Sequence, residues 1–486
     1  MKILFLAAEA APFVKVGGLG DVAGSLPRAL AALGHDVRLA LPGYGAIDWA
    51  YFRPQLRARF AVPRDGRAVA AEAWETANDG VPVYLLTGPP IPKEERVYGS
   101  SIDEDAPKFL FFSLAALEAC RELAWKPDVV HANDWHTGPA VYRLAPGATS
   151  DGFFRDTATL YTIHNLPYTG RGAGRFLGEW GLGSSERLLL LPEWARDSLL
   201  GIGLATADVL TTVSPTYARE IRTAEGGYGL DGVLRARSDR LHGVLNGIDS
   251  RSWDPATDAA LASRFDVDTL EERTANREAL REEAGLEPDE RALVLGMVSR
   301  VDSQKGFDIA LPALRRWLDS GGQLVILGSG DDAIERQLAT LELGWRGRAS
   351  VRLRFDPPYA RRIYGGADAV LIPSRYEPCG LTQMIAMRYG AVPIARRTGG
   401  LADTIDDAGD PGGTGFLFDG YDPASLLHAL ERAAGVYAHR DEWRELQRRG
   451  MKKDFSWDRS AAAYEALYRE ALRYRRAPPP AGEGER

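Results

Sequence analysis

Apolar runs alternate with amphipathic stretches along most of this chain. Residues Ile3–Ala8 form an apolar run, and apolar residues then recur at helical spacing from Leu19 to Leu33, until Gly34 ends the helix. Further strands are expected in the first half at Asp36–Leu41, Val81–Leu86, Asp128–His131, Thr159–Ile163 and Val209–Val213. The alternation restarts at Ala292–Ser299 and continues through Gln323–Leu327, Ser350–Phe355, Ala369–Ile372 and Val392–Ala395. Two successive βαβ series predict two doubly wound α/β domains, each with a mainly parallel sheet.

The boundary between these domains is expected near Asn246–Asp249, where NGID follows an apolar run. We predict a first domain over residues 1–246, a second over 247–457, and a helix over 458–476 that crosses back onto the first. Residues 477–486 (APPPAGEGER) have no apolar anchor and are expected to be disordered. The predicted ligand site is a cleft between the domains.

Length and composition agree with this organisation. The chain has 486 residues, too many for one compact core, and is 45% hydrophobic and 26% charged, as in ordinary globular proteins. A net charge of −8 argues against nucleic acid as a partner. Two cysteines, Cys120 and Cys379, allow no disulfide framework, which predicts a cytoplasmic protein. No apolar run approaches the roughly 20 residues that span a bilayer, so no membrane association is expected.

One turn in the second domain favours a ligand that is part sugar and part phosphate. In PSRYEPCGLTQ, Glu377 lies between the apolar run Ala369–Ile372 and an apolar helix beginning near Leu381. Ligands of open parallel sheets bind at the carboxyl ends of strands, where such turns lie. The helix start also offers backbone N–H groups and a positive dipole end to an anion.

Two further loops add candidate anion contacts. In SRVDSQKG, Arg300 and Lys305 follow a strand and can both reach one diphosphate. In KVGGLGDV, Lys15 precedes Gly17, Gly18 and Gly20, which would let the backbone approach a phosphate closely. This loop matches neither the dinucleotide fingerprint nor a Walker loop, so a purely structural glycine turn is the alternative.

Histidines follow two neighbouring strands of the first domain, in HANDWHTG (131–138) and TIHNLPYTG (162–170). His164, in a polar turn at a strand end, is the best functional candidate, whereas a structural hydrogen bond is the default for any lone histidine. A metal interpretation is weak, because no HExxH-type spacing or third ligand appears. No acidic pair stands near the cationic loops to hold Mg²⁺, so we expect metal-independent chemistry.

Taken together, these motifs resemble the bacterial glycogen synthase and plant starch synthase family. The resemblance extends over nearly the whole chain, in the family's order, through KVGGLGDV, DWHTG, IHN, GLDGVL, NGID with Trp253–Pro255, SRVDSQKG, PSRYEPCGLTQ and RRTGGLADT. It implies the GT-B fold, two Rossmann-like domains around a deep cleft. It also implies transfer of glucose from ADP-glucose to the non-reducing end of an α-1,4-glucan, with retention and without a cofactor.

The resemblance assigns a role to each matching residue. Lys15, Gly17 and Gly18 would lie by the donor phosphates, and Arg300 and Lys305 would clamp the diphosphate. Glu377 would bind the glucose hydroxyls, and His164 would lie beside the reacting carbon. The remaining substrate contacts would come from Asp21, Asn165, Asn246, Phe355, Cys379, Gly380, Leu381 and Thr382.

Three positions depart from related patterns. Many nucleotide-sugar transferases carry a second Glu eight residues after the first, where this chain has Ile385; the synthase subgroup also lacks it. Asp105 occupies a position where the family usually has Asn, and Arg354 one where it usually has Gly. Phe355 is then the residue expected to stack on the base.

Alternative functions remain open at this stage. The chain could use UDP-glucose or build another glucoside, or it could be a non-catalytic glucan-binding relative, although the presence of Arg300, Lys305 and Glu377 argues against a mere binder. An NAD-dependent oxidoreductase is disfavoured, because both the fingerprint and the acidic residue after the second strand are lacking. The sequence has no pattern that sets the oligomeric state.

Overall fold

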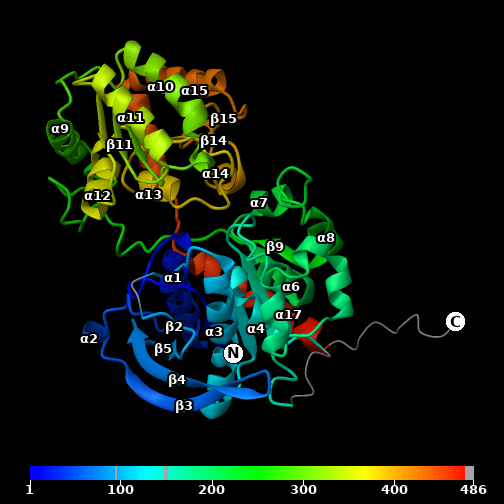
Figure 1. Ribbon diagram of the computed structural model, residues 1–486. Helices are drawn as coiled ribbons and strands as arrows, with labels where there is room; N and C mark the ends of the chain where they lie inside the picture. Colours follow the sequence, from blue (N-terminus) through cyan, green and yellow to red (C-terminus); the bar gives the residue numbers. More distant parts are fainter. Residues whose placement is uncertain (94–95, 147–151, 477–486) are drawn as a thin grey trace. The chain divides into compact units, whose positions relative to one another are not determined.

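The computed structural model describes residues 1–93, 96–146 and 152–476 (Figure 1). The chain divides into two compact units. Unit 1 comprises Met1–Gly247 and the C-terminal segment that begins at Trp457, and unit 2 comprises Ile248–Ser456. The tail predicted to be disordered, residues 477–486, lies outside the described residues. No helix in the described part of the chain is long and apolar enough to cross a membrane.

Unit 1 is built on a nine-stranded sheet in the order β3-β4-β5-β2-β1-β6-β7-β8-β9. Its strands are β1 (Lys2–Leu6), β2 (Asp36–Pro42), β3 (Gln55–Arg64), β4 (Arg67–Asn78), β5 (Val81–Thr87), β6 (Val129–Asn133), β7 (Ala158–Ile163), β8 (Val209–Thr212) and β9 (Leu241–Gly243). Its helices are α1 (Gly18–Ala32), α2 (Trp49–Phe52), α3 (Ile102–Glu122), α4 (Gly138–Arg143), α5 (Gly174–Glu179), α6 (Leu199–Thr206), α7 (Pro215–Glu220), α8 (Asp231–Ala236) and α17 (Trp457–Arg476).

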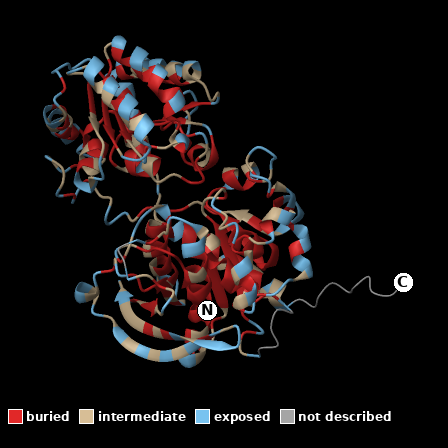
Figure 2. Ribbon diagram, in the orientation of Figure 1, coloured by how far each residue is buried: buried red, intermediate tan, exposed pale blue. Residues whose placement is uncertain are grey.

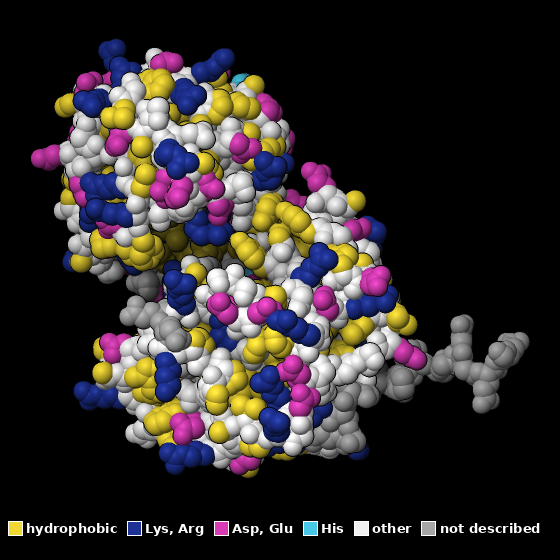
Figure 3. Space-filling model, viewed as in Figure 1, with side chains coloured by type: hydrophobic (Ala, Val, Ile, Leu, Met, Phe, Trp, Pro, Cys, Tyr) yellow, Lys and Arg dark blue, Asp and Glu magenta, His cyan; other side chains and the backbone are white. Residues whose placement is uncertain are grey.

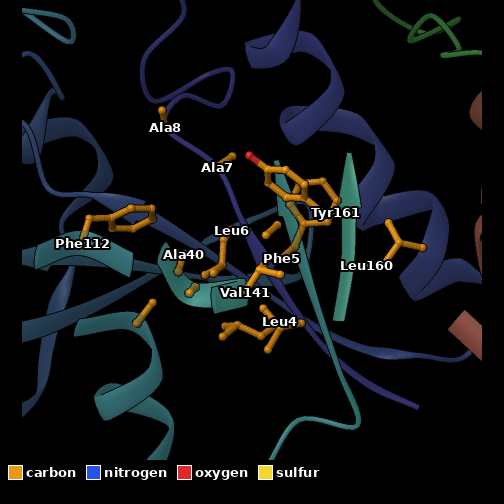
Figure 4. Close-up of a cluster of buried hydrophobic side chains, with 14 of the residues drawn as sticks. Leu4, Phe5, Leu6, Ala7, Ala8, Ala40, Phe112, Val141, Leu160 and Tyr161 are labelled. Atoms are coloured by element: carbon orange, nitrogen blue, oxygen red, sulfur yellow. The ribbon is translucent and has the colours of Figure 1, made fainter. Parts of the chain in front are cut away.

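The core of unit 1 forms because its central strands are apolar on both faces. Ile3–Leu6 of β1 and all of β7 are buried, as expected for strands covered by helices on each side (Figure 2). In Figure 4, Leu4, Phe5 and Leu6 lie in one cluster with Val141 of α4 and Leu160 and Tyr161 of β7. Burying one such side chain contributes about 1.5–3 kcal/mol.

The C-terminal helix α17 belongs to unit 1, although it follows unit 2 in sequence. It packs on α1 and β7, and the fully buried Tyr464 and Tyr468 lie against the His131 ring of β6. At its last turn, Arg475 bonds the Asp208 carboxylate at 2.6 Å and the Leu144 carbonyl at 2.8 Å. Both charged side chains are about 5% exposed, so the helix end is held by a buried ion pair.

An antiparallel hairpin, β3–β4, extends one edge of the unit 1 sheet and is absent from the strands expected from the sequence. Its two-residue turn is Asp65–Gly66, with φ of 48° and 67°, between the partners Arg64 and Arg67. Asp-Gly between alternating sequences is a strong hairpin pattern, and β3 does alternate in burial (Figure 2). The apolar-run criterion missed it because polar residues interrupt the first half of β3, at Gln55, Arg57 and Arg59.

Unit 2 has a six-stranded, all-parallel sheet in the order β12-β11-β10-β13-β14-β15. Its strands are β10 (Val294–Val298), β11 (Gln323–Leu327), β12 (Ala349–Arg352), β13 (Ala369–Ile372), β14 (Val392–Arg396) and β15 (Phe416–Phe418). Its helices are α9 (Arg273–Ala284), α10 (Phe307–Asp319), α11 (Asp332–Gly344), α12 (Pro357–Gly366), α13 (Thr382–Arg388), α14 (Gly399–Thr404), α15 (Pro423–Tyr437) and α16 (Arg440–Lys452). The two doubly wound α/β units predicted from the apolar runs are confirmed.

Each sheet has one point where the direction of winding reverses. In unit 1 the reversal lies between β1 and β6, and in unit 2 between β10 and β13. Ligands of doubly wound sheets bind beyond the carboxyl ends of the strands at such a point. The loops that follow β1 and β6, and those that follow β10 and β13, are therefore where a site is expected.

Candidate active site

The switch point of unit 2 holds a lysine–glutamate pair. Lys305 follows β10 and Glu377 follows β13, and the Lys305 Nζ lies 2.7 Å from the Glu377 Oε2. The Ser374 hydroxyl donates to the same carboxylate oxygen at 2.8 Å. The two charged side chains are 18% and 10% exposed, so this pair is largely shielded from water but still open at one side.

The turn that carries Glu377 is held by hydrogen bonds from α13 and from the start of α14. Gln383 of α13 donates to the carbonyls of Cys379 and Gly380 at 3.0 and 2.8 Å, and Gly400 N donates to the Glu377 carbonyl at 3.0 Å. Gly380 has φ of +72°, a conformation that other residues rarely adopt. A Cβ on Gly399 would approach the Glu377 carbonyl oxygen, so the glycine permits the close packing of two loops.

The other predicted residues of unit 2 also follow the carboxyl ends of its strands. Arg300 follows β10 and bonds Asp302 at 3.2 Å, and its side chain is 55% exposed. Leu381 and Thr382 are half-buried at the start of α13. Phe355 follows β12 and is 88% exposed, an unusual state for a large apolar ring.

The glycine loop of unit 1 follows β1 and leads into α1. Lys15 Nζ lies 2.7 Å from Asp21 Oδ1 in the first turn of that helix. Burial raises the pKa of Asp21, and the Lys15 ammonium partly opposes this rise. A Cβ on Gly18 would meet nothing within 4 Å, so this side of the loop is open. Gly17 instead donates its N–H to the buried carboxylate of Glu9 at 2.8 Å.

His164 follows the carboxyl end of β7 and is oriented by the last residue of β6, Asn133, and the next residue, Asp134. Its Nε2 lies 2.9 Å from Asn133 Oδ1, and its backbone N–H donates to Asp134 Oδ1 at 2.7 Å. Because Asn133 Nδ2 donates to the Leu6 carbonyl, its Oδ1 is the acceptor, which assigns the imidazole proton to Nε2. Burial lowers the pKa of His164 to about 3, so the ring is neutral at ordinary pH. Burial also raises the pKa of Asp134 to about 7.

Two buried amide oxygens of unit 1 lack a partner among the described residues: Asn165 Oδ1, beside His164, and Asn246 Oδ1, near the end of the unit. A buried polar atom without a hydrogen bond costs about 1–3 kcal/mol. Such atoms also occur elsewhere in the chain, as at the Tyr359 hydroxyl and Trp443 Nε1, so this state alone does not mark a ligand site. Both residues were expected to contact substrate.

The sequence-predicted residues thus follow the carboxyl ends of strands, after β1, β7 and β9 in unit 1 and after β10, β12 and β13 in unit 2. The sequence placed Asn133 and Asp134 at a strand end without giving them a role, and it did not indicate the other residues that hold the site: Glu9, Tyr98, Ser374 and Gln383. Glu9 lies between β1 and the glycine loop, so the sequence shows that it is near the loop. The neighbouring residues, however, do not reveal whether its carboxylate accepts from backbone N–H groups or faces solvent.

No group of three or more His, Cys, Asp or Glu side chains within the described ranges is placed to hold a metal ion. On the face shown in Figure 3, basic and acidic side chains are interspersed over each unit. Unit 1 offers the Lys15 ammonium to an anion, and unit 2 offers Arg300 and Lys305.

Comparisons with known proteins identify the family. Residues 2–236 match the model for the starch synthase catalytic domain, and residues 277–449 match glycosyl transferases group 1. The chain is 44% identical to a glycogen synthase from Moorella thermoacetica, with 98% of each chain covered. It is 42% identical to a glycogen synthase from Syntrophotalea carbinolica, covering 97% of this chain and 99% of the relative.

Solved structures agree. The catalytic domain of starch synthase IV from Arabidopsis thaliana, bound to ADP and acarbose, matches with a TM-score of 0.88 at 35% identity. The match covers 97% of this chain and 99% of that one. Sucrose-phosphate synthase from Thermosynechococcus elongatus, at 20% identity and a TM-score of 0.61, shares the fold. The chain therefore belongs to the glycogen synthase and starch synthase family of retaining GT-B glycosyltransferases, which use a nucleotide-sugar donor and a glucan acceptor.

Proposed function

We propose that the chain transfers glucose from ADP-glucose to the non-reducing end of an α-1,4-glucan. The observation that supports this most directly is the Lys305–Glu377 pair at the unit 2 switch point. A carboxylate can accept hydrogen bonds from sugar hydroxyls, while an ammonium 2.7 Å away can reach a phosphate on the same ligand. One ligand that needs both groups side by side is a nucleotide sugar.

The donor would bind unit 2 through its three chemical parts. Glu377 would accept from glucose hydroxyls, with the backbone of Cys379, Gly380 and Leu381 and the side chain of Thr382 as further contacts. Arg300 and Lys305 would neutralise the diphosphate. The exposed ring of Phe355 would stack on the base, since an aromatic face at 88% exposure is available for a planar ligand.

In unit 1, Lys15 and Gly18 would approach the donor phosphates. Asp21, Asn165 and Asn246 would contact the substrates, and the partnerless Oδ1 atoms of the two asparagines are suited to accept from sugar hydroxyls. His164 would lie beside the reacting carbon. As a neutral ring protonated at Nε2, it adds no positive charge next to a developing oxocarbenium ion.

The proposed reaction breaks the bond between glucose C1 and the diphosphate oxygen, and forms a bond between C1 and the acceptor's 4-hydroxyl oxygen on the same face. The departing phosphate oxygen takes the hydroxyl proton. Arg300 and Lys305 stabilise the charge that grows on the leaving group, and removing one such group costs ~10²–10³ in rate. Retention through a covalent intermediate would need a carboxylate nucleophile. Trapping a glycosyl-enzyme with a slow substrate would therefore contradict front-face attack.

A cytoplasmic location is part of the proposal. Cys120 and Cys379 are both buried and are not joined in a disulfide, the usual state in a reducing compartment.

Release of ADP from ADP-glucose, with and without glycogen and in the presence of EDTA, tests the proposed function. We expect glycogen-dependent release that persists in EDTA and falls at least 10²-fold in Glu377→Ala. Asp407→Asn is the matched control, because Asp407, in the loop before β15, pairs with Arg432 of α15 at the amino end of the sheet, whereas Glu377 follows the carboxyl end of β13. Faster turnover of UDP-glucose, or glycogen binding without turnover of either donor, would overturn the proposal.

A further inference from the structure

The Glu9 carboxylate, just after β1, accepts three hydrogen bonds from two separate segments of unit 1. The Glu9 side chain is buried, at 3% exposure. One carboxylate oxygen, Oε2, accepts from the backbone N–H groups of Val16 and Gly17, the latter at 2.8 Å. The other, Oε1, accepts from the Tyr98 hydroxyl at 3.0 Å. A single buried carboxylate thus joins the glycine loop to a segment more than 80 residues away in sequence.

The glycine loop is shaped around this carboxylate. A Cβ on Gly20 would lie 3.1 Å from Glu9 Oε2 and 3.0 Å from Lys15 Cγ, and a Cβ on Gly17 would lie 3.6 Å from Glu9 Oε1. Gly18, by contrast, faces open space. The loop therefore has two sides: an inner side occupied by the protein's own anion, and an outer side from which Lys15 and Gly18 can meet a ligand.

The Tyr98 segment is fixed from its other side as well. Asp105 accepts from Gly99 N at 2.8 Å, and Lys108 donates to the Val97 carbonyl at 2.6 Å. Asp105 and Lys108 form a buried ion pair with side chains 9% and 3% exposed. Asp105, which stands where the family usually has Asn, thus accepts a hydrogen bond from the backbone N–H of Gly99. Since Tyr98 is anchored, its hydroxyl is a fixed point for Glu9.

We propose that Glu9 is a positioning residue for donor binding: it holds Lys15, Gly17 and Gly18 in the conformation that receives the donor phosphates. This inference rests on the proposed function. Glu9 does not touch the donor, because its carboxylate lies on the inner side of the loop. Its effect is transmitted through the two backbone hydrogen bonds, and a misplacement of about 1 Å in such a loop can cost 10²-fold in rate.

Three substitutions separate position from charge. Glu9→Gln keeps the length of the side chain; its oxygen can accept from Val16 and Gly17, and its NH₂ can donate to the Tyr98 oxygen. Glu9→Asp keeps the charge but withdraws the carboxylate by about 1.5 Å, one carbon–carbon bond. Glu9→Ala removes both. A positioning role predicts that Gln is tolerated better than Asp, whereas a role for the charge predicts the reverse order.

Asp208→Asn is the matched control. Asp208 is also a buried carboxylate of unit 1 that accepts from backbone, at Thr159 N, but it precedes β8 at the amino end of the sheet. The Asp208→Asn substitution should lower the free energy of unfolding without changing kcat or KM for ADP-glucose.

The experiment measures kcat and KM for ADP-glucose at saturating glycogen, together with amide hydrogen exchange over residues 12–24. We expect kcat/KM for the donor to fall about 10²-fold in Glu9→Ala and less than tenfold in Glu9→Gln, with faster exchange of the loop in the former. The KM for glycogen should stay unchanged. Donor kinetics in Glu9→Ala equal to those of Asp208→Asn, or Glu9→Asp more active than Glu9→Gln, would overturn the inference.

The two proposals fail differently. Wild-type protein that turns over no ADP-glucose would refute the proposed function, while the exchange data still decide whether Glu9 holds the loop: unchanged exchange in Glu9→Ala and Glu9→Asp would refute that. If Glu9→Ala does not fold, the order of the Gln and Asp variants decides between a positioning role and a role for the charge.

Discussion

Replacing Lys305 with alanine tests the cation of unit 2 through both stability and rate. The variant leaves the Glu377 carboxylate, at 10% exposure, without its ammonium but still bonded to Ser374. Breaking a fully buried pair costs roughly 3–5 kcal/mol. Because the Ser374 hydroxyl remains and the site is partly open, we expect a loss of about 2 kcal/mol, or a Tm lower by roughly 4–8 °C for a domain of this size. Urea or thermal unfolding measures this loss.

Lys305→Ala should also lower kcat, and this loss is separate from the loss of stability. If Lys305 neutralises the leaving diphosphate, kcat falls ~10²–10³-fold, equivalent to about 3–4 kcal/mol. A double-mutant cycle with Glu377→Gln separates the two effects. The stability cost of Lys305→Ala should largely vanish in the Glu377→Gln background, since the ion pair is already gone, whereas the loss in kcat should persist. Steady-state transfer from labelled ADP-glucose, at saturating donor and glycogen, measures kcat in all four proteins. A loss in kcat that also vanishes in the Glu377→Gln background would contradict a direct role in the leaving-group chemistry, because Lys305 would then act only by holding Glu377.

Three further predictions follow from individual contacts. Phe355→Ala, at an exposed position, should raise the KM for ADP-glucose about tenfold, the cost of one stacking contact of ~1–3 kcal/mol, with Tm unchanged. Arg475→Ala leaves the Asp208 carboxylate buried without a positive partner, and should lower the free energy of unfolding of unit 1 by about 3 kcal/mol in a urea titration. The control Arg469→Ala breaks an exposed pair and should lower it by less than about 0.5 kcal/mol. His164 has a folded pKa of about 3, below its ordinary 6.5, so the unfolded chain binds more protons and stability falls as pH is lowered through 6.5. Urea titrations at pH 7.5 and 5 should therefore show about 2 kcal/mol more acid destabilisation in the wild type than in His164→Asn.

The buried strands were predictable because their sequences leave few alternatives. β1, β6, β7, β10 and β13 are short apolar runs that a parallel sheet buries on both faces. The strand order, and with it the point where the winding reverses, is visible only in the structure. The residues after β1, β10 and β13 were nevertheless candidates, because ligands of parallel sheets bind at the carboxyl ends of strands. The candidate site could therefore be located from the sequence, since its residues come directly after those strands.

The hairpin β3–β4 and the network around Glu9 escaped prediction for two different physical reasons. β3 alternates between half-buried and exposed residues, so a search for apolar runs passes over it, although Asp65–Gly66 marks its turn. Glu9 contacts Tyr98 through tertiary structure alone. A buried carboxylate that accepts from backbone N–H groups has no periodicity, and its partners are fixed only when β1 and the segment before α3 have folded together.

The sharpest test of the proposed function is transfer of ¹⁴C-glucose from ADP-glucose to glycogen, followed by digestion of the product with an exo-hydrolase specific for α-1,4 links. We expect label in the glycogen, its complete release by that enzyme, and at least a 10²-fold loss of incorporation in Glu377→Ala but not in Asp407→Asn. Label that appears as free glucose, that resists the exo-hydrolase, or that is incorporated equally by Glu377→Ala would contradict an α-1,4-glucan synthase with Glu377 in its site.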